Sequence, residues 1–261
     1  MAFRLGCIQF EGAAGEVSRN LDCMAALAAR AAGEHGVELA LFAEMAPTCY
    51  ARPETLRAAA EPLDGPMVKY MADVARANRM DLAFGMPELS ESSGARYNTM
   101  VYLDEEGHVR AAYRKTHLFG SECEWASPGN AAFAFETRFG KAAMWICYDT
   151  RFPEAARACA LGGARFALVA TAWLGPPDEW ELAVRSRAMD NGIFVAGADQ
   201  IGREEGLVCR GLSVIADPHG RVIARAEAGH EAIVVADIDL REVDRFYERV
   251  PVLRHRRSDL A

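Results

Sequence analysis

Apolar residues along the chain alternate between two spacings, one typical of β-strands and one typical of amphipathic helices. The apolar run at residues 37–43 has the length of a buried strand. Between residues 16 and 33 the apolar side chains instead recur every three or four positions, which indicates a helix with one buried face. The pattern predicts strands at 3–9, 37–43, 81–88, 96–104, 108–114, 140–146, 165–170, 193–199, 211–217, 221–226 and 232–238, and helices at 16–33, 66–79, 153–161 and 178–191.

The order of these elements indicates an α/β fold whose last third is different in kind. Helices stand between many of the earlier strands, whereas residues 218–220 (PHG) form a turn that joins two neighbouring strands into a hairpin. We therefore expect a mixed sheet, or two sheets, covered by helices. No long linker, low-complexity tract or repeat divides the chain, so one domain over residues 1–261 is predicted.

Composition narrows the class of protein. The 261 residues carry a formal net charge of −8, which argues against binding to nucleic acid or to an anionic membrane surface. The sequence shows no membrane-spanning run and no apolar core of a secretion signal, so we expect a cytoplasmic protein. Its seven cysteines include no CxxC pair, so neither a disulfide scaffold nor a zinc or other metal site is predicted, and no organic cofactor is signalled.

Three polar residues follow directly after predicted strands: Glu44, Lys115 and Cys147. Chemistry in open α/β sheets gathers beyond the carboxyl ends of strands, so the three would meet at one sheet edge if their strands lie side by side. A thiol becomes an effective nucleophile when a base accepts its proton and a cation stabilises the thiolate. Glu44 is such a base and Lys115 such a cation. Each of these three residues, taken alone, could instead have a purely structural role. His117 is an alternative candidate for the base.

The residues around these three resemble the motifs of the nitrilase-like carbon–nitrogen hydrolases. Residues 145–154 (WICYDTRFPE) are similar to the cysteine motif of that family, and residues 114–119 (RKTHLF) to its lysine motif. Residues 42–45 (FAEM), followed by Thr-Cys-Tyr at 48–50, are similar to its glutamate motif. The three motifs occur in the family's order. The likeness extends over almost the whole chain, including residues 170–173 (ATAW), which match a segment that lines the family's pocket.

This resemblance implies a fold, an assembly and a mechanism. The fold would be a four-layer α-β-β-α sandwich with mixed sheets. The protein would be a homodimer or a higher homo-oligomer, with an arm at about residues 246–261 as a plausible interface. Glu44 would accept the thiol proton of Cys147, which attacks an amide carbonyl. Lys115 and the backbone N–H of Tyr148 would hold the oxyanion, and water would release the acid from a thioester.

Amidases of the family often carry a second glutamate between the lysine motif and a downstream Pro-Gly pair. Counting from Lys115, and back from the Pro-Gly pair at 128–129, the match without a gap is Glu122, and Glu124 is the alternative two positions away. The resemblance implies that this carboxylate positions the amide and holds Lys115 in line. Either glutamate could instead be a solvated loop residue.

Four residues are candidates for substrate binding: Cys49, Tyr50, Tyr148 and Trp173. Cys49 stands where the family often has glycine, so its side chain would be expected to narrow the acyl pocket. Ala43 stands where the family often has proline. Neither departure changes a reacting group. Tyr50 and Trp173 suggest a partly aromatic pocket, although each has an equally plain interpretation as a core residue.

The predicted activity is hydrolysis of a small-molecule carboxamide by water to an acid and ammonia, through a cysteine thioester. Nitrile hydrolysis and N-carbamoyl amine hydrolysis share this chemistry and are alternatives on the same scaffold. Tyr148 stands where nitrilases commonly have tryptophan, and the short stretch from Lys115 to Pro128 resembles the amidase branches, so an amidase is favoured. The alternative from another class is a non-catalytic binding or redox-sensing protein.

Overall fold

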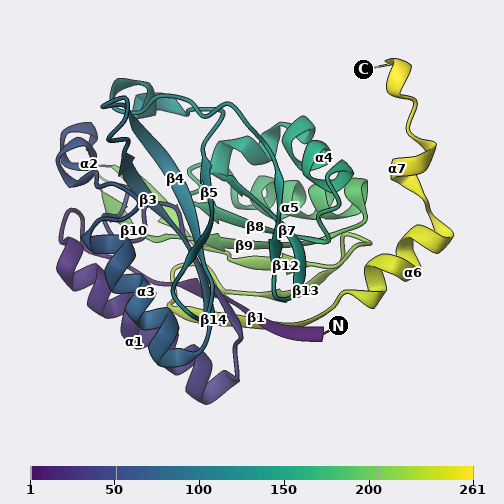
Figure 1. Cartoon of the computed structure of the whole chain (residues 1–261), viewed down its shortest axis with the longest axis horizontal. Coiled ribbons are helices and arrows are strands. Elements are labelled where there is room, and N and C mark those ends of the chain that lie inside the picture. Colours follow the sequence, from purple (N-terminus) through teal and green to yellow (C-terminus); the bar gives the residue numbers. More distant parts are fainter. Residues whose placement is uncertain (1, 51, 205, 261) are drawn as a thin grey trace.

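The chain folds into four layers in a computed structural model that describes residues 2–50, 52–204 and 206–260 (Figure 1). The strands are β1 (Ala2–Gln9), β2 (Leu39–Phe42), β3 (Asp81–Leu89), β4 (Arg96–Leu103), β5 (Val109–Arg114), β6 (Ala134–Thr137), β7 (Gly140–Ile146), β8 (Phe166–Thr171), β9 (Phe194–Asp199), β10 (Ile201–Glu204), β11 (Leu207–Arg210), β12 (Val214–Ala216), β13 (Val222–Arg225) and β14 (Ala232–Asp239). The α-helices are α1 (Val17–His35), α2 (Pro53–Ala59), α3 (Pro66–Asn78), α4 (Pro153–Leu161), α5 (Pro177–Asn191), α6 (Arg241–Arg249) and α7 (Val252–His255), and short 3-10 helices are η1 (Gly120–Glu124), η2 (Cys147–Arg151) and η3 (Ser258–Leu260).

Two mixed sheets form the middle layers. The first sheet has the strand order β14-β1-β2-β3-β4-β5, and the second has the order β13-β12-β9-β8-β7-β6. Strands β1, β2 and β3 are parallel, as are β7, β8 and β9, and the other pairings within these sheets are antiparallel. Helices α1 and α3 cover the outer face of the first sheet, and α4 and α5 cover that of the second (Figure 1). The predicted α-β-β-α sandwich is confirmed.

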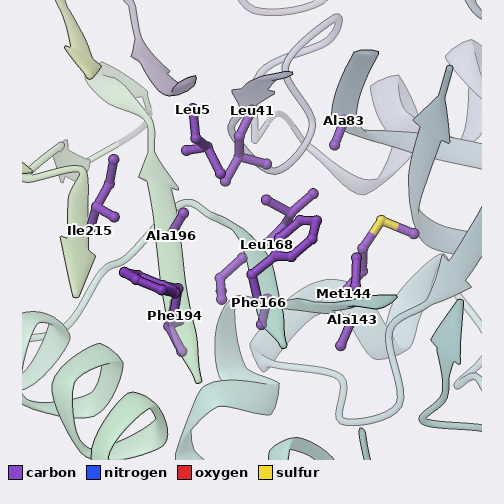
Figure 2. Close-up of a cluster of buried hydrophobic side chains, with 14 of the residues drawn as sticks. Leu5, Leu41, Ala83, Ala143, Met144, Phe166, Leu168, Phe194, Ala196 and Ile215 are labelled. Atoms are coloured by element: carbon purple, nitrogen blue, oxygen red, sulfur yellow. The ribbon is translucent and has the colours of Figure 1, made fainter. Parts of the chain in front are cut away.

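Successive residues of a strand face opposite layers, so a strand that is covered on both sides is apolar throughout. In β2, Leu39 and Leu41 pack into the core between the sheets, whereas Ala40 and Phe42 pack into the core beneath the helices. Figure 2 shows the core between the sheets, where Leu41 of the first sheet lies opposite Leu168 of the second. Full burial of one such leucine stabilises the fold by about 1.5–3 kcal/mol.

Each predicted helix and strand has a counterpart, and most boundaries agree within about two residues. The strand predicted at 211–217 is the exception, because it begins only at Val214. Gly211 and Leu212 have φ angles of 77° and 76°, which an extended strand does not allow. The elements that the pattern missed are short or polar: α2, β6, β10, β11, α6 and α7.

The carboxyl-terminal helices α6 and α7 lie at one edge of the molecule (Figure 1). Phe246 of α6 is buried against Gly192 and His219, so the arm expected at 246–261 still packs on the main body at its first residue. Beyond α6 the described side chains are half-buried or exposed. Over the described ranges, no helix is both long and apolar enough to cross a membrane.

Candidate active site

Glu44, Lys115 and Cys147 meet at the carboxyl ends of their strands, but these strands belong to two different sheets. Glu44 follows β2 and Lys115 follows β5, both in the first sheet, whereas Cys147 follows β7 in the second. The expectation of a single sheet edge is therefore wrong. Because the two sheets are packed face to face, their carboxyl ends lie together, and the site forms between them.

The ammonium group of Lys115 lies at the centre of the site. Its Nζ is 2.8 Å from Oε1 of Glu44 and 2.7 Å from Oε1 of Glu122, and all three side chains are buried. The side-chain amide of Asn98 donates hydrogen bonds to the same two oxygens, at 2.7 Å and 2.9 Å. The two carboxylates and the ammonium are thus held in fixed positions and closed to bulk water.

Burial and charge set the protonation of the buried groups. Burial alone would lower the pKa of Lys115, but the negative charges around it outweigh that effect and raise its pKa, so the ammonium stays charged. Burial raises the pKa of Glu122, against the opposing effect of Lys115. Burial, and then the charge of Glu44, raise the pKa of the Cys147 thiol. The resting thiol therefore keeps its proton until a base accepts it.

Cys147 occupies a strained turn at the end of β7. Its φ angle is 45°, in the left-handed region that costs a residue other than glycine about 1–3 kcal/mol. The chain passes from Ile146, the last residue of β7, directly into η2. A strained residue at a strand exit is typical of nucleophiles that must stand clear of the sheet. The Sγ atom faces the carbonyl oxygen of Ala172 at 4.0 Å.

The backbone of neighbouring strands orients Glu44. The N–H of Ala172, just after β8, donates to Oε2 of Glu44 at 2.9 Å, while Oε1 accepts from Lys115. Gly85 of β3 lies directly against the Glu44 backbone, because a Cβ atom at position 85 would come within 2.8 Å of the Glu44 Cα. One carboxylate therefore reaches both the ammonium and the peptide that faces the thiol.

Two residues of the site, Asn98 and Ala172, were not predicted from the sequence. Asn98 did carry a signal, because asparagine is disfavoured within a strand such as β4 and so requires a reason. Ala172 contributes only its backbone N–H and C=O, which any residue would supply, so the sequence carries no signal for it.

The structure brings Glu122, rather than Glu124, to Lys115. Glu122 is buried in η1, and its Oε2 accepts the backbone N–H of Phe119 at 2.7 Å. Glu124 is exposed, and its backbone carbonyl accepts a hydrogen bond from Arg57. In a 3-10 helix, residues two apart point in different directions, so only one of the two can face the cluster.

Asp149 links the segment that follows β5 to the turn that follows β7. Its Oδ1 accepts the backbone N–H of His117 at 2.9 Å and the hydroxyl of Thr116 at 2.8 Å. Its Oδ2 accepts the hydroxyl of Tyr113 at 2.8 Å and the backbone N–H of Ile146 at 3.2 Å. This buried carboxyl therefore ties the lysine-bearing segment of the first sheet to the cysteine-bearing turn of the second.

His117 has contacts that support a structural role. Its Nδ1 lies 2.8 Å from Oδ1 of Asp149, and its ring stacks on Phe152 with 3.7 Å between ring centroids. These contacts fix the orientation of the imidazole ring, and among the described residues none of them joins the ring to Cys147.

A cavity of about 120 Å³ opens beside Cys147. Three of the four expected binding residues line it, namely Tyr50, Tyr148 and Trp173. The remaining described lining residues are Phe119, Arg151, Ala172, Leu174 and Gly175, together with Cys147 itself. Within the described chain, no three or more His, Cys, Asp and Glu side chains gather in a way that could hold a metal ion.

Cys49 lies outside the described lining of this cavity. Its φ angle is 57°, and its side chain packs against Gly12 and the side-chain amide of Asn20. A Cβ atom on Gly12 would come within 2.4 Å of the Cys49 Sγ. The expectation that Cys49 narrows the acyl pocket is corrected, because the left-handed backbone turns its side chain toward α1.

Comparison with known proteins identifies relatives of this chain. A family model described as carbon-nitrogen hydrolase matches residues 4–248. A probable nitrilase of Schizosaccharomyces pombe is 34% identical over 244 residues, which cover 92% of this chain and 90% of the relative. The human omega-amidase NIT2 is 35% identical over 214 residues, which cover 77% of this chain and 76% of the relative.

Solved structures show the same fold. Nit3 of Saccharomyces cerevisiae, described as a member of branch 10 of the nitrilase superfamily, superposes with a TM-score of 0.91 at 29% identity and covers 98% of this chain and 97% of its own. A mutant of the Nesterenkonia AN1 amidase superposes with a TM-score of 0.87 at 28% identity and covers 99% of this chain and 95% of its own.

Proposed function

The chain belongs to the carbon–nitrogen hydrolase family and is an amidase of the nitrilase superfamily, and we propose that Cys147, Glu44, Lys115 and Glu122 carry its reaction. The observation that carries this proposal is the buried cluster in which one ammonium contacts two carboxylates beside a thiol. Buried charges of this kind cost folding free energy, so their enclosure behind the cavity that Cys147 lines supports a chemical role.

The first step is nucleophilic attack. Glu44 accepts the thiol proton while the Cys147 Sγ bonds to the amide carbon and the carbonyl π electrons move onto oxygen. The ammonium of Lys115 favours this step, because it stabilises the negative charge that leaves the thiol and appears on the substrate. The backbone N–H of Tyr148, the first residue after the nucleophile, is the second proposed donor to the oxyanion.

The second step breaks the C–N bond. Glu44 returns its proton to the substrate nitrogen, the tetrahedral intermediate collapses, ammonia leaves, and a thioester to Cys147 remains. Glu44 then takes a proton from water, whose oxygen attacks the thioester carbon. Collapse of this second intermediate releases the acid, and the thiolate regains its proton. Glu122 positions the amide nitrogen and keeps Lys115 in line throughout.

The lining of the cavity supports a small acyl group with an anionic end. A volume of about 120 Å³ suits a short chain, and a Nesterenkonia amidase of the same superfamily has been solved with butyramide. Arg151 is the cationic residue of the described lining, and its guanidinium also lies 5.0 Å from the Trp173 ring centroid. Guanidinium groups bind carboxylates well. Relatives named omega-amidases support an amide at the end of an acyl chain as the reacting group.

Two broader properties are also proposed. We propose a homodimer or higher homo-oligomer, supported by the exposed residues Leu182 and Met189 on α5 and by the position of α6 and α7 at the molecular edge. A cytoplasmic location is also proposed, because the seven cysteines include no CxxC pair and their pattern suits a reducing compartment. Light scattering tests the first proposal, and cell fractionation tests the second.

The test of the activity is ammonia release from a panel of carboxamides, nitriles and N-carbamoyl amines, with Cys147→Ala as the control. The proposal expects release from short amides, with the highest kcat/KM for those that end in a carboxylate. Release confined to nitriles or to N-carbamoyl amines would assign one of the alternative reactions on the same scaffold. Release that persists in Cys147→Ala would overturn the thioester route. Failure of all three substrate classes would favour the non-catalytic alternative.

A matched pair of variants tests the second glutamate. Glu122→Gln keeps the size of the side chain but removes a charge that contacts Lys115, so kcat should fall by about 10²-fold or more. Glu124→Gln makes the same change two residues away in an exposed position and should leave kcat near that of the natural protein. Equal effects of the two substitutions would refute the role of Glu122.

A further inference from the structure

Asp199, the last residue of β9, is a buried carboxyl group that the proposed reaction does not use. Its exposed fraction is 1%, and its Oδ1 accepts the backbone N–H of Trp173 at 2.9 Å. The backbone N–H of Gln200 donates instead to the carbonyl of Thr171 at 3.1 Å. The described hydrogen bond to its carboxyl group comes from a backbone amide, and none comes from a lysine, arginine or histidine. A buried carboxylate without a counter-charge is costly, so this residue requires an explanation.

The peptide that Asp199 holds adjoins the one that Glu44 holds. The N–H of Ala172 donates to Glu44 and the N–H of the next residue, Trp173, donates to Asp199, each at 2.9 Å. The carbonyl of Ala172 is the group that faces the Cys147 Sγ. A shift of this short segment would therefore move the base and the nucleophile relative to each other.

Asp199 is also fixed from the first sheet. Its backbone N–H donates to the hydroxyl of Ser213 at 2.9 Å, and that hydroxyl donates to Oε1 of Gln9 at 3.0 Å. Gln9 is the last residue of β1, and its side-chain amide donates to the carbonyls of Glu227 and His230. The chain of hydrogen bonds thus runs from the end of β1, across the sheets, to the peptide beside the thiol.

The environment favours the protonated form of Asp199. Burial raises its pKa well above the ordinary range, the backbone N–H of Trp173 opposes this only in part, and the negative charge of Glu44 raises it further. The other groups described around it, from Gln9, Ser213 and Trp173, are uncharged. An uncharged acid can hold the peptide without adding a further negative charge beside the base and the developing thiolate.

We propose that Asp199 is a positioning residue of the active site that works as the uncharged acid. It holds the Ala172–Trp173 segment and so keeps Glu44 and Cys147 in the right positions relative to each other. This inference rests on the proposed function, because it assigns Asp199 a part in keeping the base beside the thiol.

Two substitutions separate this role from simple filling of space. Asp199→Asn keeps the shape, the neutral state and the oxygen that accepts the Trp173 N–H, so kcat should stay within about threefold of that of the natural protein. Asp199→Ala removes the acceptor, so kcat should fall by about 10- to 100-fold while KM changes little. Asp81→Asn and Asp81→Ala are the matched controls. Asp81 is another buried carboxyl, but it lies at the amino end of β3, whereas the site lies at the carboxyl ends of the strands.

A second measurement does not depend on amide turnover. The rate at which iodoacetamide alkylates Cys147, followed on its own peptide by mass spectrometry, reports how well Glu44 accepts the thiol proton. It should fall by about 10-fold or more in Asp199→Ala, and stay close to the natural rate in Asp199→Asn and both Asp81 variants. Absence of amide hydrolysis by the natural protein would defeat the proposed function, but the alkylation rates would still decide the role of Asp199.

The results that overturn the inference are specific. A folded Asp199→Asn protein that loses more than about 10-fold in kcat would show that the charge of Asp199, and not its neutral form, is required. A folded Asp199→Ala protein with natural kcat and alkylation rate would show that the segment needs no such support. If Asp199→Ala fails to fold, Asp199→Ser takes its place, and Asp199→Asn still decides the protonation state.

Discussion

The two ends of the same sheets hold two ionic clusters of different character. At the carboxyl ends, Lys115 is fully enclosed with Glu44 and Glu122. At the amino end of β3, Asp81 is equally buried, but its cation, Arg138, keeps 32% of its side chain exposed, 2.8 Å away. The first cluster is closed to water, whereas the second reaches it through the guanidinium.

This difference in exposure separates the Lys115 cluster, which serves a reaction, from the Asp81–Arg138 pair, which links parts of the fold. Enclosing a lysine with two carboxylates costs several kcal/mol of desolvation per ion, which attraction within the cluster offsets only when the geometry is good. A fold gains little from such an arrangement, although a reaction that develops negative charge gains much. Arg138 instead retains part of its hydration and bridges Asp81 to Glu105 of the β4–β5 turn, as a structural link does.

The largest expected effect comes from emptying the enclosed cluster. Lys115→Met should lower kcat by about 10²–10³-fold, because the developing negative charge loses its cation. It should also lower the free energy of unfolding by about 3–5 kcal/mol, because two buried carboxyl groups lose their partner. Steady-state kinetics and urea unfolding measure the two effects. Lys141→Met, which removes a half-exposed lysine at the start of β7, is the control and should change neither quantity much.

A smaller effect is expected from the link between the two sheets. Asp149→Ala removes the acceptor of the Thr116 hydroxyl and of the His117 N–H, so kcat should fall by about 10- to 100-fold. Asp149→Asn keeps one oxygen for Thr116 and His117 but turns an amide toward the N–H of Ile146. Its kcat should therefore lie between that of the natural protein and that of Asp149→Ala. A kcat for Asp149→Asn below that of Asp149→Ala would contradict this account.

At the opposite end, the expected effect is on stability alone. Arg138→Met leaves the buried Asp81 with the hydroxyl of Tyr102 as its remaining described partner, so the free energy of unfolding should fall by about 1–3 kcal/mol. The kcat should not change, because the substitution lies at the far end of the strands. Parallel loss of kcat at a temperature where the variant is fully folded would show that the two ends are coupled.

The smallest effect is a change in pH dependence. Burial raises the pKa of Asp81, although the hydrogen bond from Tyr102 and the charge of Arg138 oppose it. The folded protein therefore binds the proton more tightly than the unfolded chain, whose aspartates titrate near about 3.9. The free energy of unfolding should fall as the pH rises from that value through the folded pKa. Asp81→Asn lacks this titration, so the stability of the natural protein relative to the variant should decrease between about pH 4 and pH 7. A constant difference would contradict the raised pKa.

Much of the fold follows from the sequence because its strands are apolar on both faces. In β2 every side chain is buried, and such runs are recognisable without any partner. Strands such as β10 and β11 carry no such signal, because they pair only with each other outside the two large sheets. The start of β12 was misplaced because the left-handed backbone at Leu212 depends on its tertiary surroundings.

The site was less predictable than its three charged or reactive residues suggest. Local order placed Glu44, Lys115 and Cys147 at strand ends, but it could not show that two sheets supply them. The contacts of Asn98 and of the Ala172 backbone arise only when distant strands are brought together. Cys49 shows the opposite error. Its place where the family often has glycine suggested a pocket residue, but its left-handed backbone turns the side chain elsewhere.

The close packing of Gly85 has a consequence for how this sequence can vary over evolutionary time. With the Glu44 Cα only 2.8 Å from where a Cβ would lie, any larger residue at position 85 must push the base out of place. Selection on the reaction therefore reaches a residue with no side chain and no chemistry of its own. Such a position tolerates substitution as little as the nucleophile does. In a library of all residues at position 85, selection for activity would retain glycine and remove the other variants.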